Sequence, residues 1–204
     1  MEFSLGTPVA LTLALSAVIL VGLLVHLETG RFIATLVFTV YLVGVANFAL
    51  LLLRSDPALS EAVGSTDLSR LLGVTPFLLP GAEPLTNDQL YLNILLTVPF
   101  GLGLPFVLSV SPRTVVMLGV LFSVGIELAQ GIADVTGLAL PTWSVDINDV
   151  LLNSFGVMVG VGCFFLAHLA YRGVFGDLDA HKMGPWKHFH TTLASGRASV
   201  SLNA

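Results

Sequence analysis

The chain has 204 residues, of which 55% are hydrophobic and only 10% are charged. Soluble domains usually carry about 25% charged residues, so this composition excludes a soluble globular fold and predicts a polytopic membrane protein. Only eight lysines and arginines stand against thirteen acidic residues, which also excludes a nucleic-acid-binding surface. The single cysteine, Cys163, lies in an apolar run and cannot form an internal disulfide, so we interpret it as a small buried residue.

Five apolar segments are long enough to cross a bilayer, which takes about 20 residues of helix. No lysine or arginine precedes the first of them, so we expect it to be retained as a helix and not removed as a signal peptide. We therefore predict an all-α bundle of about five transmembrane helices within residues 1–171, followed by a polar, partly disordered tail at 172–204. The predicted spans lie at about 8–27, 32–53, 90–110, 114–132 and 148–171.

The longest connection, residues 54–89, has an apolar centre that is too short to span a bilayer. This centre either lies at the membrane interface or re-enters between the helices. The segment that follows contains Pro99, Gly101, Gly103 and Pro105. Because proline removes a backbone hydrogen bond, we predict a bend in this third helix that faces protein and not lipid.

Two further patterns are assigned to packing and solvation. Gly156 and Gly160 in the last span have a small-residue spacing that permits close helix packing and indicates dimerisation only weakly. In the tail, His181, His188 and His190 match no compact metal-ligand spacing, so we interpret them as residues of a solvated segment.

The basic residues predict how the bundle is oriented. With five spans, only Arg54 and Arg70 fall on the side of the N-terminus, and the other basic residues fall on the side of the C-terminus. By the positive-inside rule, the C-terminus is then cytoplasmic and the N-terminus lies outside. The polar ends of the third, fourth and fifth spans consequently face outward. The C-terminal group comprises Arg31, Arg113, Arg172, Lys182, Lys187 and Arg197.

Polar residues gather in this outward layer. Glu127 and Gln130 are three residues apart and share a helix face, as do Asp149 and Asn153, which are four apart. Asp146 precedes the last helix and is suited to cap it. A charged group in mid-membrane costs about 2.5–3.5 kcal/mol to insert, so we expect Glu127 to face the bundle interior and to mark a functional site. The predicted polar site comprises Asn93, Glu127, Gln130, Asp146, Asp149 and Asn153.

The carboxylates of this layer have no cationic neighbour in the sequence, because no lysine or arginine lies between Arg113 and Arg172. Three alternatives remain open. One carboxyl group retains its proton, a divalent cation such as Mg²⁺ or Ca²⁺ binds between the carboxylates, or they meet a cationic or hydroxylated ligand. The layer contains no histidine and no nucleophile paired with a base, so the sequence assigns neither a catalytic residue nor a metal site.

The polar residues resemble the pattern of the VanZ-like family of bacterial membrane proteins. In that pattern an asparagine precedes Pro-x-Gly in one helix, as Asn93, Pro99 and Gly101 do in NILLTVPFG. The next helix ends in Glu-x-x-Gln, here ELAQ at 127–130, and the following helix starts Asp-rich, here DINDVLLNSFG at 146–156. The three blocks occur in the family's order. At one position the chain departs from the family, with Trp143 where an arginine is usual.

What the resemblance implies is a role in the cell envelope, at the outer face of the bacterial plasma membrane. The family is named for a protein associated with resistance to the glycopeptide teicoplanin, so an envelope lipid precursor or a glycopeptide is the implied partner. An arginine at Trp143 would neutralise the acidic cluster, so its loss separates this chain from the family's usual charge pattern. Three classes of function stay open: a binding or supporting protein, an intramembrane enzyme that acts on a lipid-linked substrate, and a small transporter.

Overall fold

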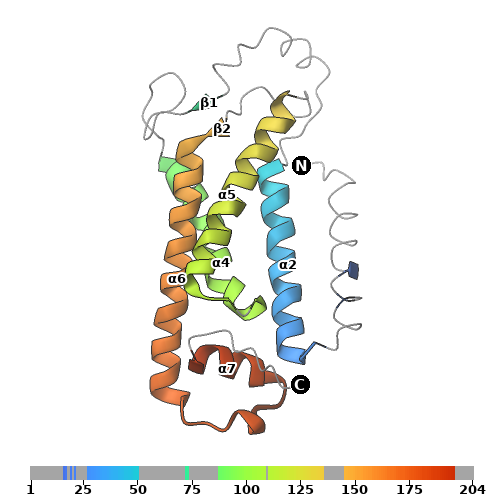
Figure 1. The fold of residues 1–204 in the computed structure, drawn as a ribbon, viewed down its shortest axis with the longest axis vertical. Helices are drawn as coiled ribbons and strands as arrows, with labels where there is room; N and C mark the ends of the chain where they lie inside the picture. The colour runs from blue at the N-terminus through green and yellow to red at the C-terminus, as the bar shows by residue number, and fades with distance from the viewer. Residues whose placement is uncertain are drawn as a thin grey trace.

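The computed structural model describes residues 16–17, 19, 21, 27–50, 72–73, 87–108, 110–135 and 145–195. Within these residues, four long helices run side by side and alternate in direction along the chain (Figure 1). Each contains an apolar stretch long enough to cross a membrane, so the predicted all-α membrane bundle is confirmed. The four helices are α2 (Thr29–Leu50), α4 (Asn87–Val107), α5 (Pro112–Val135) and α6 (Ile147–Phe175).

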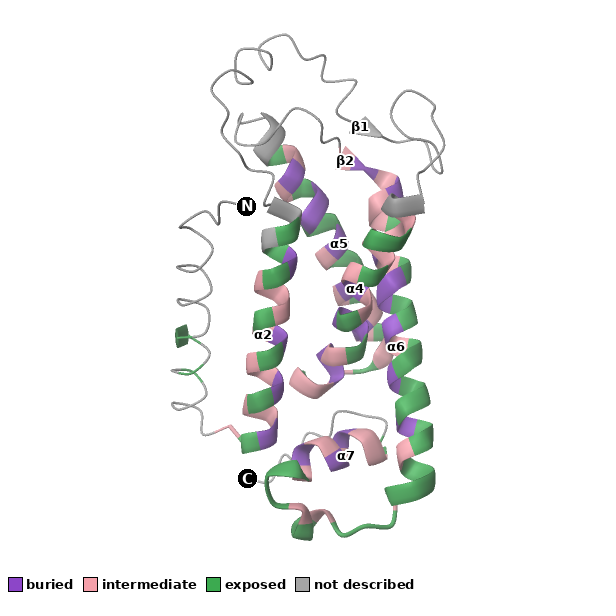
Figure 2. Cartoon of the chain, turned by 180° about the vertical axis from the view of Figure 1, so that it is seen from behind, coloured by how far each residue is buried: buried purple, intermediate pink, exposed green. Residues whose placement is uncertain are grey.

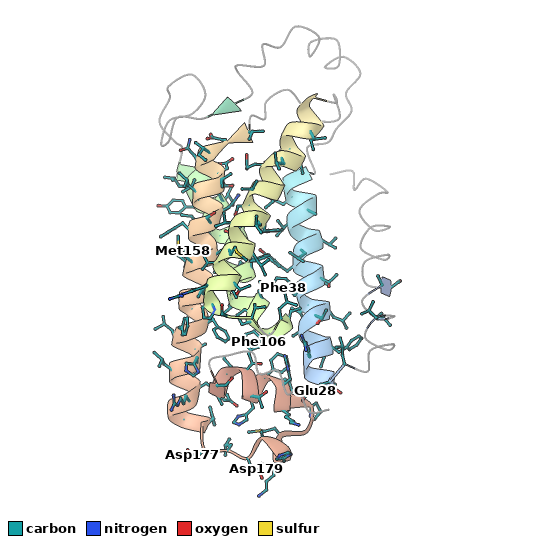
Figure 3. The ribbon with its side chains drawn as sticks, in the orientation of Figure 1. Glu28, Phe38, Phe106, Met158, Asp177 and Asp179 are labelled. Carbon is teal, nitrogen blue, oxygen red and sulfur yellow. The ribbon has the colours of Figure 1, made fainter. Side chains whose placement is uncertain are left out.

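These helices occupy the regions predicted for the second to fifth spans. Most of the first predicted span, 8–27, lies outside the described residues. α4 continues as one helix through Pro99 and Pro105, and the predicted bend in it stays a prediction. In the middle of the bundle Phe38 of α2 points toward α4 (Figure 3). The apolar core there consists of Phe38, Phe100, Leu104, Val115 and Val157.

The closest packing in the bundle joins α4 to α6. A Cβ atom added to Gly101 would collide with the carbonyl oxygen of Val157, and one added to Gly160 would collide with that of Val98. Gly156 lies equally close to the backbone of α4. Only glycine permits backbones to approach so closely, and the spacing of Gly156 and Gly160 serves this contact between helices of one chain.

Two short strands lie at one end of the bundle, which we call the strand end. β1 (Leu72–Gly73) belongs to the long connection and pairs in parallel with β2 (Val145–Asp146), directly before α6. Leu72 lies opposite Val145, and Gly73 lies opposite Asp146. The long connection therefore passes the start of α6 (Figure 1). Most of residues 54–89, including the apolar centre after residue 73, lies outside the described residues.

After α6 the chain folds back across the opposite end of the bundle, which we call the α7 end (Figure 1). η2 (Ala180–Trp186) leads into α7 (Lys187–Ser195), which lies below Phe106 at the end of α4 (Figure 3). His188 and His190 are buried there, so the prediction of a solvated segment is wrong for both. Residues 196–204 lie outside the described residues.

Hydrogen bonds explain why this polar segment folds onto the bundle. The last carbonyl groups of a helix have no partner within it. His188 Nε2 donates to the carbonyl oxygen of Phe106 at 2.6 Å, and His168 Nδ1 donates to that of Leu193 at 2.6 Å. The interpretation of Cys163 as buried is also wrong, because it lies off the buried stripe of α6 and is exposed.

Candidate functional site

The predicted site residues meet at the strand end. α4 and α6 both begin there and α5 finishes there, so the first turns of two helices surround the last turns of the third (Figure 1). Figure 2 shows buried positions on the facing sides of α5 and α6 near this end. The structure thus brings residues that are far apart in the sequence to one end of the bundle, from α4, α5, α6 and the β2 residue that caps α6: Asn93, Glu127, Gln130, Asp146, Asp149 and Asn153.

Glu127 ties the end of α5 to the start of α6. Its side chain is only 2% exposed, and its Oε2 atom accepts a hydrogen bond of 3.0 Å from the backbone N–H of Asp146. Asp146 in turn caps α6, because its Oδ1 atom accepts hydrogen bonds from the backbone N–H and the side-chain amide of Asn148, at 2.9 and 2.8 Å. The capping role predicted for Asp146 is therefore confirmed, and Glu127 orients the cap.

A second set of contacts ties α4 to α6. The side-chain amide of Asn93 donates to Oδ1 of Asp149. One turn further along, the Thr97 hydroxyl donates to the backbone carbonyl of Asn153 at 2.7 Å. Asn93 and Asp149 were predicted as site residues, and the structure pairs them directly.

Sequence reasoning missed three buried polar residues of this layer. Thr97 is fully buried four residues after Asn93, and Ser123 is fully buried four residues before Glu127, so both share a face with a predicted residue. This spacing was the signal that would have found them. Asn148 is also buried, and only the cap geometry of Asp146 reveals its role. Gln130 is buried on α5, one turn beyond Glu127.

Asn153 differs from its neighbours because one of its polar atoms has no partner. The residue is 2% exposed, and its Oδ1 atom is buried without a hydrogen bond from any described residue. Nearly all buried polar groups in proteins have a partner, so each exception needs an explanation. Asn153 and Asp149 lie one turn apart on α6, so the two residues share a face of that helix.

The described lysines and arginines lie far from the acidic residues of the polar layer. Asp146 and Asp149 both lie at the start of α6, and the backbone of Asp146 contacts the Glu127 side chain of α5. All lysines and arginines among the described residues lie instead at the α7 end: Arg31, Arg113, Arg172, Lys182 and Lys187. Within the described part of the chain, the acidic layer therefore has no basic partner. Trp143, where the family usually has an arginine, lies outside that part.

The described side chains do not form a metal centre. Across residues 27–50, 87–108, 110–135 and 145–195, no group of three or more histidine, cysteine, aspartate or glutamate side chains is arranged to hold a metal ion. One oxygen of Glu127 and one of Asp146 are already used by backbone N–H groups. The divalent-cation alternative therefore gains no support from this arrangement.

Comparison with known protein families matches residues 37–168 to the VanZ/LLP1 family. The match covers well over half of the chain and includes every residue of the predicted polar site. No curated protein and no solved structure showed significant similarity to the chain. The matched range contains α4, α5 and most of α6, which are the helices that form the polar layer. The chain is therefore a helical membrane protein of the VanZ/LLP1 family.

Proposed function

We propose that this protein acts at the outer face of the bacterial plasma membrane, where its polar layer binds an envelope component and alters susceptibility to teicoplanin-type glycopeptides. The observation that carries the proposal is the polar layer itself, in which Glu127 is buried and Asn93 and Asp149 are half-buried. Three helices contribute to it through Asn93, Glu127 and Asp149, and each of these side chains contacts another helix or its cap. Buried ionisable residues in membrane helices usually mark a functional site.

The distribution of basic residues supports an outward-facing site. Arg31, Arg113 and Arg172 lie within a few residues of the span ends at the α7 end. Basic residues close to span ends favour the cytoplasmic side. With the α7 end in the cytoplasm, the strand end faces outward, where glycopeptides and envelope lipid precursors are encountered.

The composition of the layer favours binding over catalysis. Ser123 is the hydroxyl nearest to Glu127 along α5, and it donates to the carbonyl oxygen of Gly119 at 2.8 Å instead of pairing with a base. A nucleophile needs an adjacent base or a lowered pKa to react. The alternative function is an intramembrane enzyme that uses Glu127, Asp146 and Asp149 on a lipid-linked substrate. An assay for turnover distinguishes this enzyme from a binding protein.

The test is glycopeptide sensitivity in a deletion strain. The strain is complemented with the wild-type protein, Glu127→Gln, Asp149→Asn or the matched control Asp177→Asn. Asp177 is an exposed acid at the α7 end (Figure 3). We expect the wild type and the Asp177 variant to restore the parental teicoplanin sensitivity profile, and the two site variants to fail at equal protein levels.

Two results would contradict the proposal. Equal complementation by all four proteins would show that the polar layer is not the functional site, and an unchanged profile on deletion would remove the glycopeptide role. Purified protein is assayed in parallel for conversion of lipid-linked envelope precursors. Turnover that Glu127→Gln abolishes would replace binding by the enzymatic alternative.

A further inference from the structure

The polar layer offers more hydrogen-bond acceptors than donors. A carboxylate has two oxygens and about four acceptor positions. Glu127 receives one hydrogen bond through Oε2, and Asp149 receives one through Oδ1. Asn153 Oδ1 receives none. Acceptors and negative charge thus accumulate where no described lysine or arginine lies.

The unpartnered oxygen of Asn153 indicates what is missing. Burying a polar group without a hydrogen bond is unfavourable, and the penalty rises in the low-dielectric interior of a bundle. The backbone of Asn153 is fixed by Thr97, and the Gly156 contact holds this part of α6 against α4. Asn153 is therefore held at this depth of the layer, on the face of α6 that it shares with Asp149.

From this arrangement we propose that the layer binds a primary ammonium group through Glu127, Asp149 and Asn153. The inference rests on the proposed function, because it names the chemistry that the same site recognises. A primary ammonium group has three N–H donors, no acceptor and one positive charge. It therefore complements three acceptors, of which two are carboxylates. It also supplies a positive charge, which no described lysine or arginine brings to this layer.

Other ligands match this layer less well. A divalent cation requires six or more oxygen ligands, and no group of metal-binding side chains is formed by the described residues. A quaternary ammonium group has no N–H to donate to Asn153. Water can satisfy Asn153 but brings no charge to the carboxylates.

The depth of the layer suits an amine carried at a membrane surface. Glu127 lies five residues before Ile132, the last residue of its apolar span, which corresponds to about 7.5 Å along the helix. A lipid headgroup amine and a small soluble amine both present the same ammonium group at such a depth. Charge pairing is stronger there than in bulk water, because the effective dielectric constant is lower.

The inference is tested with the purified full-length protein in detergent. Its melting temperature is measured against added phosphatidylethanolamine, and against phosphatidylcholine with the same acyl chains as the control without N–H donors. Soluble ethanolamine and choline form a second matched pair. Each ligand is tested on the wild type, Glu127→Gln, Asn153→Leu and Asn153→Asp, and circular dichroism checks that each variant is folded.

We expect the wild type to prefer each primary amine over its methylated analogue by about tenfold in affinity, the effect of hydrogen bonds to a charged group. Asn153→Leu and Glu127→Gln should lose the preference, whereas Asn153→Asp keeps an acceptor and should retain it. A response to soluble ethanolamine would identify a soluble amine as sufficient, and a response to the lipid alone would identify a headgroup. Both responses support the inference.

Equal binding of both members of each pair would overturn the inference, as would an unchanged preference in a folded Asn153→Leu protein. Stabilisation by Mg²⁺ without any amine preference would overturn it in favour of a cation site. The proposed function fails separately, through the glycopeptide profile of the complemented strains. A preference for primary amines without a glycopeptide phenotype would support this inference and contradict the glycopeptide role. A glycopeptide phenotype without an amine preference would support the glycopeptide role and contradict this inference.

Discussion

The strand end and the α7 end of the bundle both bury polar side chains, but these side chains have different partners. At the α7 end, His188 and Arg31 donate to the carbonyl oxygens of Phe106 and Val107, and the Arg31 bond measures 3.0 Å. These carbonyls belong to the last turn of α4 and have no partner in their own helix. His188 and Arg31 at the α7 end therefore complete the hydrogen bonding of the backbone.

At the strand end, the polar side chains offer more hydrogen-bond acceptors than the backbone N–H groups there use. Asp146 caps α6 and Glu127 holds that cap, but spare acceptor positions remain on the carboxylates and on Asn153. The difference shows how two buried polar clusters in one membrane protein can be told apart. Donors matched to helix-end carbonyls stabilise the fold, whereas unmatched acceptors without a counter-charge indicate a ligand.

Both ends depend on the packing of α4 against α6, and breaking this contact should have the largest effect. In Gly156→Val, the new side chain would collide with the Thr97 hydroxyl and the carbonyl oxygen of Ile94. We expect the free energy of unfolding to fall by about 3 kcal/mol or more, because overpacking against backbone cannot relax. Denaturant unfolding of the purified protein measures this change.

Gly162→Val is the matched control for that substitution. Gly162 is exposed on the same helix, and nothing lies within 4 Å of a Cβ atom added there. Its effect should stay within about 0.5 kcal/mol. A similar loss in both variants would show that the α4–α6 approach is not what holds the bundle together.

Removing the Glu127 side chain should separate its structural role from its role in function. In Glu127→Ala, the buried N–H of Asp146 loses its acceptor, which should destabilise the protein by about 1–3 kcal/mol. Glu127→Gln keeps an oxygen acceptor and should lose less stability while still failing in the glycopeptide assay. Thermal melting of both variants measures the difference, with the exposed Glu28→Ala at the α7 end as control. Equal stability of the Ala and Gln variants would contradict the role of Glu127 in holding the cap.

At the α7 end, His188→Leu should loosen α7 without affecting the site. The substitution leaves the carbonyl oxygen of Phe106 without its donor, which we expect to destabilise the docked helix by about 1 kcal/mol. Hydrogen exchange of the α7 amides should become faster, while glycopeptide complementation stays at the wild-type level. His181→Ala provides the control, because His181 is exposed. Loss of complementation in the His188 variant would show that the α7 end also takes part in function.

The difference between the ends also explains what the sequence could predict. Apolar runs predict the regions of α2, α4, α5 and α6, because lipid contact requires such runs whatever the tertiary packing. The site residues Glu127 and Asp149 stand out for the same reason, since a carboxylate in a membrane helix is rare. The docking of α7 could not be predicted, because its polar residues become buried only by meeting carbonyls at the end of α4.

The unpartnered atom of Asn153 was likewise beyond prediction. An asparagine in a membrane helix usually finds a partner on a neighbouring helix, and only the tertiary contacts show that one of its atoms does not. The place of Thr97 in the polar layer could have been predicted, because its spacing from Asn93 puts both residues on the same helix face. Sequence spacing thus identifies which residues share a helix face. The structure is needed to show which polar atoms on that face have no hydrogen-bond partner.

The smallest expected effect gives the sharpest comparison, because each end buries one oxygen without a hydrogen-bond partner among the described residues: Asn153 Oδ1 and Thr192 Oγ1. Thr192→Val keeps the shape of the side chain and removes the unmatched hydroxyl, so the free energy of unfolding should stay constant or rise by up to about 1 kcal/mol. Asn153→Leu should behave similarly in melting experiments without ligand. The two variants should then diverge when phosphatidylethanolamine is added, because only the Asn153 variant loses an acceptor for the amine. If both variants kept the ligand-induced rise in melting temperature, the unmatched oxygens at the two ends would be equivalent. Asn153 would then contribute no more to binding the amine than Thr192 does.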